Sequence, residues 1–190
     1  MQIKDTTSLI EPYSDFIDLE KVEFKNCKVH GVRNASVMKG YYKDEAALDA
    51  IIKKNDPLHY ETFECELPEE YGHMLYGLSK LQPGVVGDEF FMTKGHYHTV
   101  IETGEIYLCL EGEGYMLMKT QAGQVRAEKM IRGSLVYVPP YWAHRSVNTG
   151  NTPLTTLFIY PADAGHNYGD LTEEGFTKRI FKRNGGVVIE

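Results

Sequence analysis

Short runs of alternating or continuously apolar residues follow one another along most of the chain from residue 59 onward. Glycine, proline or asparagine separates the runs, and no helical pattern interrupts the series. Many short strands with turn residues between them are typical of an antiparallel sandwich or barrel. The predicted strands cover residues 60–67, 73–81, 89–98, 105–112, 114–120, 125–131, 134–139, 144–148 and 154–160.

The two ends of the chain add further elements. Residues 1–40 contain alternating patches broken by turn residues, which predict one or two strands with loops. In residues 43–54 the apolar side chains form one stripe, with acidic residues early and lysines late. This pattern predicts an amphipathic helix that packs on the outside of the sheet. Residues 176–190 predict a final hairpin around Asn184, Gly185 and Gly186.

The run at 105–110 has two faces that both need cover. Glu105, Tyr107 and Cys109 share one face, and the apolar residues 106, 108 and 110 share the other. A second subunit would bury the outer face, and the helix at 43–54 is the alternative cover. The pattern therefore favours a homodimer without requiring one.

Length, charge and cysteine content narrow the class of protein. The 190 residues fit one domain, with strands and a helix in 1–58, a barrel in 59–178 and a last strand in 179–190. A formal charge of −7 without a basic stripe argues against nucleic acid as a partner. We expect a cytoplasmic protein with no membrane partner, because no signal peptide or long apolar stretch is recognisable. The odd number of cysteines, Cys27, Cys65 and Cys109, predicts reduced thiols.

Three histidines and one carboxylate are the candidate metal ligands. His96 and His98 lie two apart in a predicted strand, so their imidazoles point the same way. Glu105 opens the next strand after a turn, and His144 follows a proline pair further on. Neutral imidazoles with a carboxylate suit a borderline divalent metal such as iron, manganese, nickel or zinc. A structural metal or a packed histidine cluster remains the alternative.

These residues sit in a frame of glycines and prolines that resembles a known superfamily. The order HxH, Glu105, Gly112 and then Gly133, Pro139, His144, Asn148 is similar to the two motifs of the cupins. More narrowly, the strings EFFMTKGHYH, EGEGYML, VYVPPYWAHRSVN and IYPADAGHNYG resemble the cupin-type glucose-6-phosphate isomerases of archaea. The chain departs from many cupins at Tyr141, where they have glycine, and in the six residues between His98 and Glu105.

The resemblance implies a fold, a reaction and a metal. The fold would be the cupin double-stranded antiparallel β-barrel, similar to a jelly roll, with the short N-terminal helix packed outside. The reaction would interconvert glucose 6-phosphate and fructose 6-phosphate, through a cis-enediolate or by a direct hydride shift. One divalent ion per subunit, with Fe²⁺ first, would bind at His96, His98, Glu105 and His144.

For the implied isomerase reaction, further residues are candidates for proton transfer and for phosphate binding. Glu105 is the preferred base, and Tyr107 or His166 could relay the proton instead. The phosphate needs donors, and Thr93, Lys94 and the Gly95 amide directly precede the histidines. By resemblance, the substrate pocket also includes Ser79, Tyr160, His166 and Tyr168.

Two other functions fit the same ligand pattern. A cupin dioxygenase would use a similar metal shell to activate oxygen on an organic substrate. A non-catalytic sugar-binding cupin would bind the sugar without turnover. The hydroxyls and glycines around the histidines favour a phosphosugar over an apolar or thiol substrate, and 190 residues leave little room for an effector domain.

Overall fold

The computed structural model describes residues 10–169, 171 and 175–190, and within these ranges most of the regular secondary structure is β-strand. Six strands form the larger sheet in the order β11-β8-β13-β5-β4-β3, and three form a second sheet in the order β10-β9-β12. All pairings between these strands are antiparallel, so the all-β prediction is confirmed. The bounds are β3 Lys28–Asn34, β4 Leu58–Glu64, β5 Met74–Leu81, β8 Glu105–Glu111, β9 Glu113–Thr120, β10 Val125–Ile131, β11 Leu135–Val138, β12 Trp142–Asn148 and β13 Leu154–Pro161.

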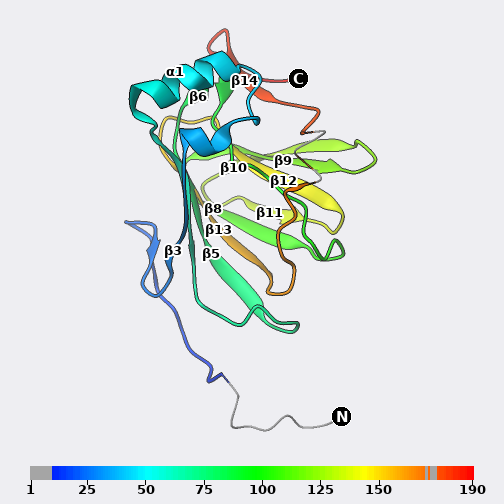
Figure 1. Cartoon of the computed structure of the whole chain (residues 1–190). Helices are drawn as coiled ribbons and strands as arrows, with labels where there is room; N and C mark the ends of the chain where they lie inside the picture. Colours follow the sequence, from blue (N-terminus) through cyan, green and yellow to red (C-terminus); the bar gives the residue numbers. More distant parts are fainter. Residues whose placement is uncertain (1–9, 170, 172–174) are drawn as a thin grey trace.

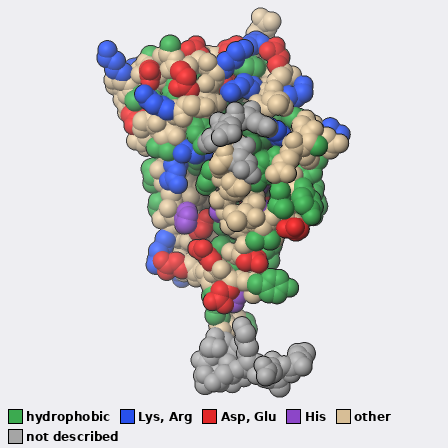
Figure 2. All heavy atoms as spheres, turned by 45° about the vertical axis from the view of Figure 1, so that its right-hand side comes forward, with side chains coloured by type: hydrophobic (Ala, Val, Ile, Leu, Met, Phe, Trp, Pro, Cys, Tyr) green, Lys and Arg blue, Asp and Glu red, His purple; other side chains and the backbone are tan. Residues whose placement is uncertain are grey.

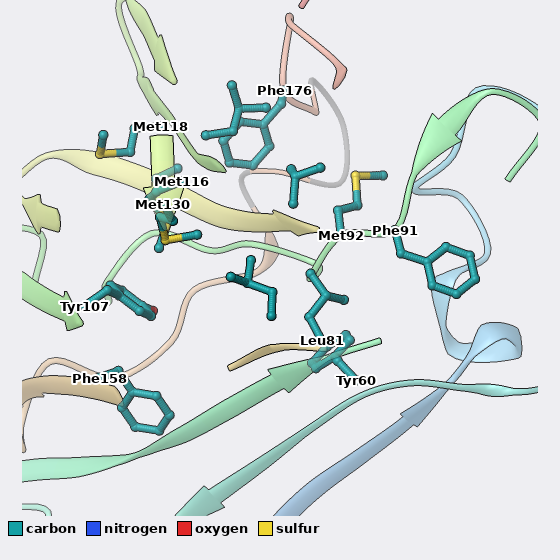
Figure 3. Packing of buried hydrophobic residues seen from close by; sticks show 14 of the residues in the cluster. Tyr60, Leu81, Phe91, Met92, Tyr107, Met116, Met118, Met130, Phe158 and Phe176 are labelled. Atoms are coloured by element: carbon teal, nitrogen blue, oxygen red, sulfur yellow. The ribbon is translucent and has the colours of Figure 1, made fainter. Parts of the chain in front are cut away.

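The core fills the space between the two sheets, as expected for a cupin barrel. Figure 3 shows the side chains of Met116, Met118 and Met130 on one side and those of Leu81 and Phe158 on the other. Met116, Met130 and Leu81 are completely buried. Along β8 the predicted alternation holds, because the odd positions from Glu105 to Cys109 are buried while Ile106 is 38% exposed.

Short elements lie outside the two larger sheets. A four-stranded sheet in the order β15-β14-β7-β6 lies near the helix α1 (Figure 1). Its final hairpin is the predicted one, with Asn184 and Gly185 at positive φ between the strands. The remaining bounds are β1 Ile17–Asp18, β2 Glu23–Phe24, η2 Ala35–Met38, α1 Glu45–Asn55, β6 Val85–Val86, β7 Glu89–Phe90, β14 Ile180–Arg183 and β15 Gly186–Ile189.

The helix α1 matches the predicted segment 43–54 closely. The Asp44 side chain caps it by accepting the Ala47 N–H at 2.9 Å, and the helix ends at Asp56, which has a left-handed backbone. Leu48 on its apolar stripe is fully buried. The helix packs mainly against η2 and β6 rather than on the outer face of β8.

Two predictions were wrong. The run at 89–98 is not one strand: β7 ends at Phe90, and beyond it only isolated bridges join Met92, His96 and Tyr97 to other segments. Cys27 and Cys65 form a disulfide, and only Cys109 is a free buried thiol. The two cysteines flank β3 and β4, which pair side by side, a proximity that 38 residues of separation hide in the sequence.

No helix in the described part of the chain is long and apolar enough to cross a membrane.

Candidate metal centre

Four side chains from three separate segments converge inside the barrel. One ligand atom of each of His96, His98, Glu105 and His144 lies within 4.8 Å of the others. Paired backbone hydrogen bonds join His96 to His144 on β12, at 3.2 Å and 3.1 Å between nitrogen and oxygen. Glu105 is the first residue of β8, directly after the turn that follows His98. His98, Glu105 and His144 are 6%, 3% and 1% exposed.

The hydrogen bonds of His98 fix its tautomer. The Thr103 hydroxyl donates to the Val100 carbonyl at 2.6 Å, so its oxygen is free to accept from the His98 Nδ1–H at 2.8 Å. Nε2 then carries a lone pair, yet it lies 3.1 Å from Glu105 Oε2. Two acceptors that face each other at this distance suit a cation held between them.

The other imidazoles also present unpaired nitrogens to the centre. His96 Nε2 and His144 Nε2 are buried and have no hydrogen-bond partner among the described residues. His144 Nε2 lies only 2.9 Å from Glu105 Oε2 but is not aligned for a hydrogen bond. Buried polar atoms are nearly always paired, so these nitrogens fit ligands of a metal ion.

Electrostatics favour the metal-binding forms of Glu105 and His96. Burial alone would raise the pKa of Glu105, but the adjacent His144, followed by His98, lowers that pKa below its ordinary value. Burial and then the neighbouring His144 lower the pKa of His96 well below its ordinary value. An ionised carboxylate and a neutral imidazole are the forms that bind divalent metals.

Three of the four ligands, His96, Glu105 and His144, line a cavity of about 120 Å³. The molecule is shown from one side in Figure 2, where a histidine side chain is visible among acidic ones. Most of the sequence-predicted substrate residues line this cavity: Ser79, Thr93, Gly95, Tyr107, Tyr160, His166 and Tyr168. Lys94 is not among the lining residues, because its ammonium lies over the Tyr41 ring, 5.3 Å from the ring centroid. The structure therefore does not bring the Lys94 side chain to the cavity with the other predicted phosphate residues.

Aromatic rings surround the centre on several sides. The ring of His166 lies 4.4 Å from that of His96, centroid to centroid, and Tyr168 stacks on His166 at 6.2 Å. Both His166 and Tyr168 are exposed, so they lie at the mouth of the cavity. Tyr107 and Tyr160 are buried, and burial raises the pKa of both hydroxyls, so the hydroxyls stay protonated and able to donate.

One wall of the cavity was missed by the sequence analysis. His30 and Arg33 on β3 and Tyr60, Thr62 and Glu64 on β4 also line it. Residues three apart should point to opposite faces of a strand, but irregularities in β3 between Val29 and Gly31 and after Arg33 change the pattern. Which face His30 and Arg33 occupy is therefore set by how β3 pairs with β4, and it cannot be read from the sequence of β3 alone.

Known proteins resemble the chain over most of its length. The family model of glucose-6-phosphate isomerase (GPI) matches residues 32–190. A glucose-6-phosphate isomerase of Thermococcus litoralis is 46% identical over 95% of this chain and 94% of its own, and one of Pyrococcus abyssi is 47% identical over 89% and 92%. A putative glucose-6-phosphate isomerase 2 of Rhizobium meliloti is 34% identical over 94% and 90%.

Among solved structures, an oxalate decarboxylase aligns with 55% of this chain and 26% of its own, at 22% identity and a TM-score of 0.46. The assignment rests on the sequence relatives, which match nearly end to end and at up to 47% identity. The chain therefore belongs to the glucose-6-phosphate isomerase family.

Proposed function

We propose that the chain is a metal-dependent isomerase that interconverts D-glucose 6-phosphate and D-fructose 6-phosphate. The observation that carries the proposal is the convergence of His96, His98, Glu105 and His144 beside a cavity lined by hydroxyl groups. Membership of the isomerase family supports the substrate. Isomerisation moves a proton from C2 to C1 of the open-chain sugar and the carbonyl from C1 to C2, with no net oxidation.

The four ligands would hold one divalent ion, and we expect Fe²⁺, with Mn²⁺, Ni²⁺ or Zn²⁺ as substitutes. When bound, such an ion stabilises negative charge on the sugar oxygens as a Lewis acid. Both histidine contacts of Glu105 are made by Oε2. We assign Oε1 to the proton transfer between C2 and C1, which would pass through a cis-enediolate.

Tyr107 and His166 would complete the proton transfer. Tyr107 is buried close enough to Glu105 for the carboxylate charge to add to the rise of the tyrosine pKa. His166 lies at the mouth of the cavity, so its ring can reach a sugar oxygen from the solvent side. We assign His166 as the relay between the sugar oxygens and water.

The phosphate would bind away from the ligands, among Ser79, Thr93, Gly95 and Tyr168. Thr93 is well suited, because its hydroxyl oxygen accepts the Ser146 N–H at 3.0 Å and its own proton is left to donate. Tyr160, whose ring is stacked 6.2 Å from that of His98, would contact the sugar chain between the two ends.

Activity before and after metal removal tests the proposal. Fructose 6-phosphate formation from glucose 6-phosphate should be lost on chelation and restored by Fe²⁺. His144→Ala should lose metal and activity together, whereas His73→Ala, at a partly exposed position outside the cluster, should keep both. Activity that survives complete metal removal rejects the metal mechanism. Sugar binding without turnover by any metal form would instead indicate a sugar-binding protein, and ligand-dependent oxygen consumption would indicate a dioxygenase.

Glu105→Gln separates metal binding from proton transfer. The amide keeps an oxygen ligand but cannot accept the C2 proton, so the variant should retain part of its metal while turnover falls at least about a hundredfold. Metal content and turnover measured on the same sample check this result. Full-speed turnover by the variant would remove Glu105 as the base.

We also propose a homodimer formed through the outer face of the larger sheet. Ile106, Leu135 and Tyr137 on β8 and β11 are 38%, 64% and 57% exposed there, and α1 packs elsewhere. Hydrophobic side chains gather along one side of the view in Figure 2. Tyr137→Glu should convert a dimer into a monomer in sedimentation experiments, whereas Tyr71→Glu, at a position 90% exposed in a loop, should not.

A further inference from the structure

Arg145 is a buried cation without a carboxylate partner in the described part of the chain. Its side chain is 4% exposed and follows the ligand His144 on β12. Its guanidinium lies on the Phe176 ring, 4.2 Å from the centroid, and Nε has no hydrogen-bond partner among the described residues. By contrast, Arg179 pairs with Glu89 at 2.7 Å. An unpaired buried charge is unfavourable unless its field serves a bound anion.

The guanidinium also holds the backbone that leads into the site. Arg145 Nη2 donates to the Lys94 carbonyl at 2.6 Å, and Nη1 lies 2.9 Å from Met92 Sδ. A trans peptide is planar, and its C=O and N–H point in opposite directions. Because Arg145 fixes the carbonyl of the Lys94–Gly95 peptide on its own side, the Gly95 N–H is directed to the other side.

Gly95 packs against Arg145, and both residues line the cavity. Its φ is +75°, and an added Cβ would lie 2.9 Å from the His144 carbonyl oxygen, 2.9 Å from the Phe176 ring and 3.0 Å from Arg145 Cβ. Gly95 therefore packs tightly against Arg145 at the cavity wall. None of the described residues accepts a hydrogen bond from the Gly95 N–H. This amide is available to a ligand in the cavity.

We propose that Arg145 is the positioning residue of a phosphate subsite: it orients the Gly95 N–H toward a phosphate monoester oxygen and places a positive charge behind it. The ligand class rests on the proposed function. In this role Arg145, which also lines the cavity, acts through the Lys94–Gly95 peptide that its guanidinium holds. Oriented amides backed by a cation are an established way to bind an anion in a protein of net negative charge.

Calorimetric binding tests this role without depending on turnover. The Zn²⁺-loaded full chain is titrated with inorganic phosphate, with sorbitol 6-phosphate and with uncharged sorbitol. Arg145→Met should lower the affinity for both phosphate compounds about tenfold. Arg145→Lys, which keeps the charge but not the two-pronged contact, should lower it about threefold. Sorbitol affinity and metal content should stay unchanged. Arg183→Met, which removes an equal charge from the distant final hairpin, is the control.

Several results would overturn the assignment. If Arg145→Met binds phosphate and sorbitol with equally reduced affinity, or loses metal, Arg145 has a general structural role. If the variant binds phosphate with unchanged affinity, Arg145 has no role in the phosphate subsite. A measurement on the wild-type protein does not depend on how the variants fold: phosphate should shift the Gly95 amide resonance of the Zn²⁺ form, and a resonance that does not move rejects the proposal. Turnover is measured separately, so wild-type binding without isomerisation would reject the proposed function alone.

Discussion

His59 offers a test of how the buried interior responds to pH. The residue is fully buried on β4, and its Nε2 lies 2.7 Å from the Tyr42 hydroxyl oxygen. The Met92 N–H donates to that hydroxyl oxygen at 3.2 Å, so the hydroxyl proton is free to point at His59. Its ring packs 4.0 Å from that of Phe91, centroid to centroid. The surroundings therefore accommodate a neutral imidazole and leave a charged one without a counter-ion.

Burial lowers the pKa of His59 from 6.5 to about 4. The unfolded chain then binds more protons than the folded one between these two values, so acid favours unfolding. The contribution of the neutral His59 to the free energy of unfolding is fully present above pH 6.5 and is lost as the pH falls toward 4. With a factor of 1.36 kcal/mol per pKa unit, the loss from this one residue is about 1.4 kcal/mol at pH 5.5 and about 2.5 kcal/mol at pH 4.5.

His59→Gln removes the titration but keeps an acceptor for the Tyr42 hydroxyl. Urea unfolding of the metal-free protein is measured at pH 7.5, 5.5 and 4.5 and at one protein concentration. The unfolding free energy of the wild type minus that of His59→Gln should be about 2.5 kcal/mol smaller at pH 4.5 than at pH 7.5. Tyr42→Phe, which leaves the buried imidazole in place, should retain most of the wild-type pH dependence. A gap between wild type and His59→Gln that is constant over pH would refute the reasoning.

Two further substitutions test packing and buried charge. Gly77→Ala would place a Cβ 2.0 Å from the Phe63 carbonyl oxygen, so it should lower the unfolding free energy by at least about 3 kcal/mol in urea titrations. Gly123→Ala, which has free space but φ +82°, should lower it by only about 1 kcal/mol. Arg179→Met should lower it by about 3 kcal/mol, because Glu89 is 2% exposed and loses its 2.7 Å partner. Adding Glu89→Gln should restore part of that loss, and an additive double mutant would contradict the pairing.

Much of the fold could be predicted because its determinants are local. The alternation of β8, the stripe of the helix α1 and the turn at Asn184 and Gly185 each depend on neighbours in sequence, and each appears as predicted. The Cys27–Cys65 disulfide could not be predicted, because it depends on which strands pair. The backbone of Tyr141 likewise depends on a residue far away in the sequence. Tyr141 adopts φ +71° at a position where many cupins have glycine, and its N–H donates to the Ile101 carbonyl at 2.8 Å.

Around the proposed active site, the side chains do not follow the regular alternation of a β-strand. A regular strand from Thr93 to His98 would turn Gly95 away from the face that carries His96. Instead the Ser146 N–H bonds to the Thr93 side chain, and the backbone pairing resumes only at His96. The irregularities in β3 likewise bring His30 and Arg33 to the same cavity. Periodicity therefore identifies the residues that build the core, whereas the substrate-facing wall depends on bulges set by pairing with distant strands.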